Sequence, residues 1–153
     1  MFRSVVLGSN DIERSKAFYD AAMGAAGFPP AEPNERGALI YRRDGSMLII
    51  TPPLNGGAAT AANGGTIALT LASEDQVKAW HDAGAANGGT SIEDPPGLRT
   101  YPSGQQLYSA YLRDPDGIEI ELTWDRDVNE WPRDDDGAPI PSITPLDLAS
   151  FLG

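Results

Sequence analysis

The pentapeptide Lys16–Asp20, with the sequence KAFYD, returns 62 residues later as Lys78–Asp82, with the sequence KAWHD. The same offset carries Ser4, in the short apolar stretch 2–8, onto Thr66, the first residue of the apolar stretch 66–71. Both stretches have the composition of a β-strand, and both pentapeptides lie in segments with apolar residues at helical spacing. The chain therefore contains an internal repeat, and each copy begins with a strand followed by a helix.

Each copy continues with a hairpin. Asp–Gly between apolar runs is the strongest short hairpin signal, and it occurs at residues 44–45 and again at residues 116–117. The offset between these turns is 72, so the second copy holds about ten additional residues before its hairpin, with a further strand expected near 98–102. We expect strands at 2–8, 38–43, 46–51, 66–71, 107–113 and 117–124, and helices that start at Asn10 and Ser73 and stop at Gly27 and Gly88.

This order of elements predicts an α+β fold. Neither copy alone can bury its helix stripe and its sheet face, so the two copies should pack as a pair. We assign residues 1–124 to a single module, with repeat halves at about 1–54 and 66–124 and a Gly- and Ala-rich linker at 55–65. Residues 125–153 form an acidic, proline-rich C-terminal extension that we expect to pack on the module or on a dimer partner. Its candidate docking residues are Leu146, Leu148, Phe151 and Leu152.

The charge balance restricts the partners. Acidic residues outnumber basic residues 22 to 11, which gives a formal net charge of −11. Because such a surface repels phosphate backbones and anionic lipids, we expect neither a nucleic acid nor a membrane as a partner. The chain has no cysteine, and residues 1–8 lack the features of a signal peptide. A cytoplasmic location is therefore expected.

His81 is the only histidine in the chain. One imidazole excludes a site of two histidines and one carboxylate built from a single chain, and a Ser-His-Asp triad would have to use His81. The residue follows Trp80 on the second expected helix and precedes Asp82. Because that helix should lie outside the sheet, we expect His81 to point to solvent.

Three segments resemble the vicinal oxygen chelate superfamily, which contains glyoxalases, bleomycin-resistance proteins and extradiol dioxygenases. Residues Leu7–Tyr19 are similar to the first strand-to-helix signature of the superfamily, and residues Tyr111–Leu122 are similar to its final hairpin. The tail, with Trp124–Arg126, Glu130–Pro132 and Pro145–Leu148, most resembles the catechol-2,3-dioxygenase branch. The resemblance implies two tandem βαβββ units that form a curved, cup-like mixed sheet, and it implies a dimer for chains of this length.

The resemblance also implies a divalent metal in the cup. The two histidine positions of the superfamily correspond to Ser4 and Thr66, and the glutamate position corresponds to Glu121, whose counterpart in the first copy is Ile49. Hydroxyl groups do not replace imidazole as ligands of Fe, Ni or Zn, and one carboxylate makes a poor cage for Mg²⁺ or Ca²⁺. We therefore expect the metal site to be lost and predict no cofactor.

Several residues are candidates for binding an organic ligand in the cup. Ser4, Thr66 and Glu121 would supply hydrogen-bonding groups, and Glu121 is also the candidate for an acid or base in catalysis. Tyr108 is expected to stack on a planar ligand, because the superfamily often places a tyrosine there, with Tyr101 and Tyr111 nearby. Arg99 would pair with a ligand carboxylate or with one of the surplus acids of the chain. The alternative to a functional role is that Glu121 is an ordinary strand residue that faces outward beside Glu119.

The sequence thus favours a homodimeric protein that binds a small organic molecule without metal. The alternative is an enzyme, either a dioxygenase or glyoxalase-type lyase that uses Fe, Ni, Zn or Mn with atypical ligands, or a metal-free acid–base catalyst that uses Glu121. A third possibility is a structural or regulatory protein without a ligand. The sequence leaves open whether the two halves pair within one chain or across a dimer.

Overall fold

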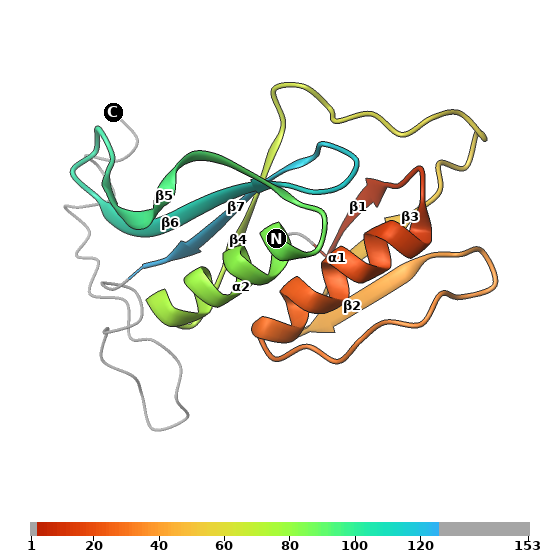
Figure 1. The fold of residues 1–153 in the computed structure, drawn as a ribbon, viewed down its shortest axis with the longest axis horizontal. Helices are drawn as coiled ribbons and strands as arrows, with labels where there is room; N and C mark the ends of the chain where they lie inside the picture. The colour runs from red at the N-terminus through yellow and green to blue at the C-terminus, as the bar shows by residue number, and fades with distance from the viewer. Residues whose placement is uncertain (1–2, 126–153) are drawn as a thin grey trace.

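The computed structural model describes residues 3–125, and these form two units with a similar order of elements (Figure 1). The first unit consists of β1 (Ser4–Gly8), α1 (Ile12–Ala25), β2 (Leu39–Arg43) and β3 (Ser46–Thr51). The second consists of β4 (Thr66–Thr70), α2 (Glu74–Ala86), β5 (Thr90–Thr100), β6 (Gln106–Arg113) and β7 (Glu119–Trp124). The α+β class and the repeat of strand, helix and hairpin are therefore confirmed. The C-terminal extension, with its expected docking residues, lies outside the described residues.

The strands form two sheets with the orders β1-β3-β2 and β4-β7-β6-β5. In each sheet the first strand of the unit runs parallel to the last strand, and the hairpin strands are antiparallel. The second unit is the expected βαβββ, whereas residues 28–38 of the first unit contain no strand and leave it as βαββ. That segment contains three prolines, Pro29, Pro30 and Pro33, which lack the N–H groups that a ladder requires. The second unit tolerates Pro95 and Pro96 because β5 is an edge strand and shifts its register there.

The N-cap of α2 is the residue predicted from the sequence, and the N-cap of α1 lies one residue after the predicted one. The Ser73 hydroxyl accepts the N–H of Gln76, as expected for the N-cap of α2, and the Gln76 side chain reaches back one residue further than in a capping box, to the N–H of Ala72. At α1, however, Asp11 and not Asn10 is the N-cap, because the Asp11 carboxylate accepts the N–H of Arg14. Asn10 instead binds two other segments, as described below.

The first Asp–Gly signal has the expected geometry. Asp44 and Gly45 both have positive φ, 50° and 78°, as a two-residue turn between twisted antiparallel strands requires. The turn after β6 is longer. There the Asp114 carboxylate accepts the N–H groups of Asp116 and Ile118, and Gly117 takes the positive φ of 88°. Both hairpins are therefore set by local turn chemistry.

The two units pack through their helices, which lie side by side in Figure 1. Phe18 and Trp80, which occupy equivalent positions in the repeat, meet edge to face with ring centroids 5.7 Å apart. Both side chains are fully buried. Two glycines of the second unit make this approach possible, since a Cβ on Gly84 or Gly89 would lie 3.0 or 2.5 Å from the Phe18 ring. The expectation that the copies pack as a pair is met within the chain.

The turn after β6 provides a second connection between the units. The Asp114 carboxylate is buried and accepts the hydroxyl proton of Tyr19 on α1 at 2.7 Å. Asp116 accepts hydrogen bonds from Asn10, through its backbone and side chain, and from Arg14. Asn10 also exchanges hydrogen bonds with the backbone of Ala59 in the linker. The start of α1, the linker and the last hairpin are therefore held together.

Replacing Gly84 by Ala tests how tightly the units pack. The new Cβ would lie 2.7 Å from Leu112 Cδ1 and 3.0 Å from Phe18 Cε2. We expect the free energy of unfolding to fall by about 1–3 kcal/mol, as for other overpacked cores, measured by chemical denaturation. Gly24→Ala, on the exposed side of α1 with no atom within 4 Å, is the matched control and should raise stability by about 0.5–1 kcal/mol. Equal stability of the two variants would contradict close packing at Gly84.

Candidate functional site

Among residues 3–125, no helix packs on one face of the second sheet. Along β7 the side chains of Ile120 and Leu122 are buried in the core with α2, whereas Glu119 and Glu121 point the other way. Tyr111 lies directly opposite Glu121 on β6, so the two share this face. We call the helix-free side of the second sheet, with Ser109, Tyr111, Glu119 and Glu121, the open face.

Glu121 is the centre of a hydrogen-bonded cluster on the open face. Its Oε1 accepts the hydroxyl protons of Tyr101 at 2.9 Å and of Tyr111 at 2.8 Å. The Tyr101 hydroxyl also lies 3.5 Å from the hydroxyl of Ser109, which is fully buried beneath the cluster. Burial, followed by the hydrogen bonds to Tyr101 and Glu121, raises the pKa of Tyr111 far above its usual value. The Tyr111 phenol therefore stays protonated and donates to the carboxylate.

Arg99 brings a positive charge to the same cluster. Its guanidinium carbon lies 5.6 Å from the centre of the Tyr111 ring, within range of a cation–π contact. The Nη2 group donates to the carbonyl of Asp94 at 2.8 Å, so the irregular part of β5 fixes the side chain. Among residues 3–125 the buried Nε of Arg99 has no hydrogen-bond partner. The structure thus brings the predicted residues Arg99 and Glu121 together through Tyr111.

Thr66 and Ser4 lie apart from Glu121. Thr66 is opposite Glu119 in the parallel pair of β4 and β7, and its hydroxyl donates to the Glu119 carboxylate at 2.7 Å. Glu121 is opposite Ala68 in the same pair. Ser4 is exposed at the start of β1 in the other sheet. The three positions that the resemblance assigned to a shared centre are therefore not joined by any contact between the described residues.

Tyr108 lies on the other side of the second sheet. It alternates with Tyr111 along β6 and shares its face with Ala110 and Leu112, which are fully buried in the core. Its ring packs against that core, and its hydroxyl lies 3.5 Å from the carbonyl of Pro96. The tyrosine of β6 that binds Glu121 is therefore Tyr111, and the stacking role expected of Tyr108 stays a prediction. A two-residue turn at Asp116–Gly117 would place Tyr111 opposite Leu122, whereas the longer turn that forms places it opposite Glu121.

The donor groups do not fit the metal that the fold family implies. The four corresponding positions hold Ser4, Ile49, Thr66 and Glu121, which offer one carboxylate and two neutral hydroxyls. Of these, the Thr66 hydroxyl is engaged with Glu119, and one oxygen of Glu121 already accepts two protons. Within residues 3–125 no three His, Cys, Asp or Glu side chains gather in a group that could hold a metal ion. We derive no reaction step through a metal here.

An apolar hollow of about 660 Å³ lies on the helix-free side of the first sheet. Its floor includes Val6 on β1, Ile40 on β2 and Ile49 on β3, and Leu54 stands at its edge. Val6 is 59% exposed and Leu54 is 89% exposed, so apolar surface is open to a partner. The volume lies in the range of roughly 300–1,000 Å³ that is typical of small-molecule sites. Ile49, the counterpart of Glu121, makes this half apolar.

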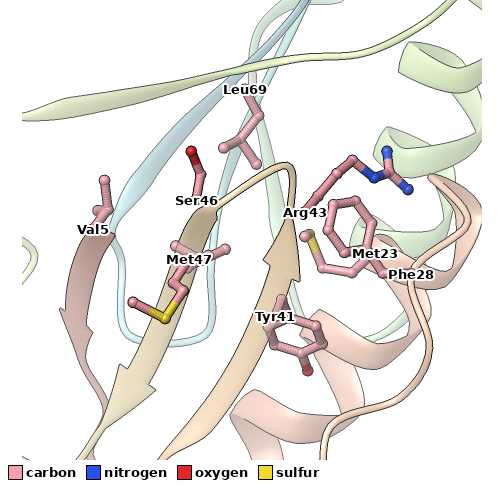
Figure 2. Close-up of a pocket in the computed structure, with 9 residues that line it drawn as sticks. Val5, Met23, Phe28, Tyr41, Arg43, Ser46, Met47 and Leu69 are labelled. Atoms are coloured by element: carbon pink, nitrogen blue, oxygen red, sulfur yellow. The ribbon is translucent and has the colours of Figure 1, made fainter. Parts of the chain in front are cut away.

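A second, smaller cavity of about 170 Å³ lies beside α1 (Figure 2). Figure 2 shows Met23 and Phe28 on one side of it, Val5 on the other and Leu69 of the second unit above. The guanidinium of Arg43 stacks 3.8 Å from the centre of the Phe28 ring and borders the cavity. This cavity shares no lining residue with the cluster around Glu121.

His81 does not point to solvent as expected; it is 8% exposed. Its Nε2 lies 2.9 Å from the Ser91 hydroxyl, and its Nδ1 lies 3.5 Å from the Asp82 carboxylate. The reason is visible in the repeat, since the equivalent residue of the first copy, Tyr19, is fully buried. The alignment of KAFYD with KAWHD therefore indicates that His81 is buried, which its position on the helix alone did not.

The pH dependence of stability in alkaline solution tests the burial of three tyrosines, one of which belongs to the cluster around Glu121. The pKa values of Tyr111, Tyr19 and Tyr41 are raised in the folded chain, in each case first by burial. The unfolded chain loses these protons near pH 10 while the folded chain keeps them, so the contribution of these tyrosines to stability should be constant below about pH 10 and fall above it. Chemical denaturation between pH 8 and pH 11 measures this.

Tyr111→Phe should weaken that alkaline loss of stability, because one of the three titrating groups is gone. Tyr108→Phe removes a hydroxyl from the opposite face of the same strand and serves as the matched control. If phenolate absorbance of the wild-type protein grew fully around pH 10 while the chain was still folded, the buried cluster would be disproved.

Two comparisons with known proteins, one against family models and one against solved structures, agree on the fold. The family model of the Glyoxalase/Bleomycin resistance protein/Dioxygenase superfamily matches residues 2–122. A search of curated proteins gives no match. A glyoxalase/bleomycin resistance protein from Albidiferax ferrireducens T118 is 46% identical in sequence, with a TM-score of 0.77 over 81% of this chain and 98% of that one.

Two further crystal structures show the fold alone. A glyoxalase-related enzyme from Fulvimarina pelagi is 24% identical, with a TM-score of 0.62 over 94% of this chain and 99% of that one. A lactoylglutathione lyase from Agrobacterium tumefaciens is 19% identical, with a TM-score of 0.55 over 81% of this chain and 92% of that one. The paired-unit architecture is thus shared by proteins whose sequences have diverged widely.

Proposed function

Because this chain belongs to the Glyoxalase/Bleomycin resistance protein/Dioxygenase superfamily, we propose that it binds a small organic molecule in the cup of this fold without a protein-bound metal ion. The observation that carries the proposal is the Tyr101–Glu121–Tyr111 cluster. Two phenols occupy one oxygen of the carboxylate that the superfamily would present to a metal. The site is thus organised by hydrogen bonds between side chains.

The cluster supports recognition of a ligand with hydrogen-bond donors and a planar ring. Between residues 3 and 125 only Oε1 of Glu121 is engaged in a hydrogen bond, which leaves Oε2 to accept one from a ligand. The rings of Tyr101 and Tyr111 offer apolar surface beside it. Arg99, held by the backbone of Asp94, is placed to attract an anionic group of the ligand. Ser4 and Thr66 remain candidates for further hydrogen bonds.

The apolar hollow of the first sheet supports a second contact. Val6, Ile40 and Ile49 present aliphatic side chains there. Burial of such surface contributes roughly 25 cal/mol per Å². A ligand with one polar end and one apolar end would match the polar second sheet and the apolar first sheet. The ligand is held by hydrogen bonds and by burial of its apolar surface, and no covalent bond is made or broken.

A ligand screen on the full chain tests the proposal. Catechols, hydroxy acids and aromatic antibiotics form the panel. A ligand that binds should raise the melting temperature, because at a concentration of one hundred Kd it adds about 2.7 kcal/mol to the free energy of unfolding. Glu121→Gln should weaken the binding of that ligand about tenfold or more in calorimetry, because a charged acceptor is lost. Glu119→Gln, two residues away on the same face, is the matched control.

Two results would contradict this function. The first is stoichiometric Fe, Ni, Zn or Mn in the purified wild-type protein that Glu121→Gln lacks, which would favour a metal-dependent dioxygenase or lyase. The second is a ligand whose affinity falls in Glu119→Gln and is unchanged in Glu121→Gln. Elemental analysis and calorimetry of the three proteins separate these cases.

We further propose that the protein is a cytoplasmic homodimer. In the described part of the chain, β1 and β4 each form an edge of their own sheet, and no strand pair joins the two sheets. Unpaired edge strands present free backbone donors and acceptors to another chain. Within residues 3–125 no helix has the length and apolar character needed to cross a membrane.

Sedimentation equilibrium measures the dimer directly. We expect a mass of twice 16.2 kDa at micromolar concentration. Val6→Lys, on β1, should shift the equilibrium toward single chains because it brings a charge into the contact. Lys in place of Leu98, which is equally exposed on β5 in the other unit, is the control. A wild-type mass of one chain at all concentrations would exclude the dimer.

A further inference from the structure

A second chemical constellation lies on the side of the second sheet that faces α2. Ser91, at the start of β5, is opposite Leu112, which is fully buried against α2. From α2, His81 places its Nε2 at 2.9 Å from the Ser91 hydroxyl oxygen. The Asp82 carboxylate lies 3.5 Å from the other ring nitrogen of His81. The serine thus contacts one ring nitrogen of the histidine and the aspartate contacts the other, which is the arrangement that activates a serine nucleophile.

The burial pattern favours an oriented base and an accessible nucleophile. His81 is 8% exposed, so its ring is held by the surrounding chain, whereas Ser91 is exposed. A proton on Nδ1, next to the Asp82 carboxylate, leaves Nε2 free to accept the Ser91 proton. Asp82 is 65% exposed and neighbours His81 in sequence, so its influence on the ring is the weaker part of the arrangement. The Ser91–His81 pair is the essential part.

The strand that carries Ser91 is irregular just beyond it. The register of β5 against β6 shifts between Ile92 and Gly97, and Glu93 has a positive φ of 58°. Such bulges are over-represented next to active sites, because they redirect side chains and backbone groups. β5 is also the edge of its sheet, and an edge strand leaves alternate N–H groups without a partner in the sheet. Free N–H groups of this kind stabilise an oxyanion.

We propose that Ser91 is a nucleophile activated by His81 and that the pair accepts the acyl group of a small carboxylic ester. The Ser91 oxygen attacks the ester carbonyl carbon while His81 Nε2 takes the serine proton. The bond from that carbon to the alkoxide then breaks, and His81 returns the proton to the departing alcohol. Water hydrolyses the acyl-serine to the carboxylic acid and restores Ser91. This activity is independent of ligand binding at Glu121.

A fluorophosphonate probe tests the proposal on the full-length protein. The serine oxygen forms a bond to phosphorus, fluoride leaves, and His81 takes the proton, so the product is a stable phosphonyl-serine. We expect intact-mass analysis to show one adduct per chain and peptide mapping to place it on Ser91. Ser91→Ala should abolish the adduct. Ser103→Ala, at another exposed serine in the loop before β6, should leave it unchanged.

His81→Gln separates activation from structure. Its amide can still bind the Ser91 hydroxyl but cannot take its proton, so labelling should slow by about 10²-fold or more. Labelling of Ser103 as fast as Ser91, or of His81→Gln at the wild-type rate, would show that His81–Ser91 is only a structural hydrogen bond. If His81→Gln does not fold, hydrolysis of p-nitrophenyl acetate by the wild type and by Ser91→Ala decides. Equal rates would overturn the proposal.

Discussion

The contact between Phe18 and Trp80 is the interaction on which the rest of the architecture depends. The two rings occupy the same position in the two copies of the repeat, so they meet as equivalent residues do across a two-fold interface. Gly84 and Gly89 allow the close approach, since no side chain larger than hydrogen fits beside the Phe18 ring. Because α1 and α2 pack against each other on one side of the sheets, no helix among residues 3–125 covers the opposite side. The location of the candidate ligand site follows from this.

Buried polar groups at the last turn add specificity to this apolar contact. Burial raises the pKa of Asp114 above its usual value, although Tyr19 and the backbone N–H groups of Asp116 and Ile118 oppose that rise by binding the ionised form. A buried carboxylate without these partners would cost several kcal/mol. The turn therefore tolerates one arrangement of α1, in which the Tyr19 hydroxyl reaches Asp114. The apolar contact drives the pairing of the units, and the polar one fixes their relative position.

The two copies of the repeat have diverged in chemistry while they kept the same frame. Glu121 of the second copy gathers Tyr101 and Tyr111, whereas Ile49 of the first copy lies in an apolar hollow. Tyr19 of the first copy is a buried partner of Asp114, whereas His81 of the second copy is a buried partner of Ser91. Each pair differs by one side chain at an equivalent position. The first difference leaves a carboxylate on one unit only, and the second gives the two units different buried hydrogen bonds. This divergence, more than the fold, decides which surfaces can act on a ligand.

The sequence by itself determined the repeat, the order of strand, helix and hairpin in each unit, and the residue types at Ser4, Thr66 and Glu121, because these depend on periodicity, turn chemistry and residue type. Only the tertiary structure decided which tyrosines meet Glu121, since strand register sends Tyr108 to one face and Tyr111 to the other. It also decided that His81 is buried against Ser91, because the exposure of a helix residue depends on what packs beside the helix. The tertiary structure also decided that residues 28–38 form no strand. The prolines of that segment do not settle this alone, because β5 shows that an edge strand can accommodate prolines.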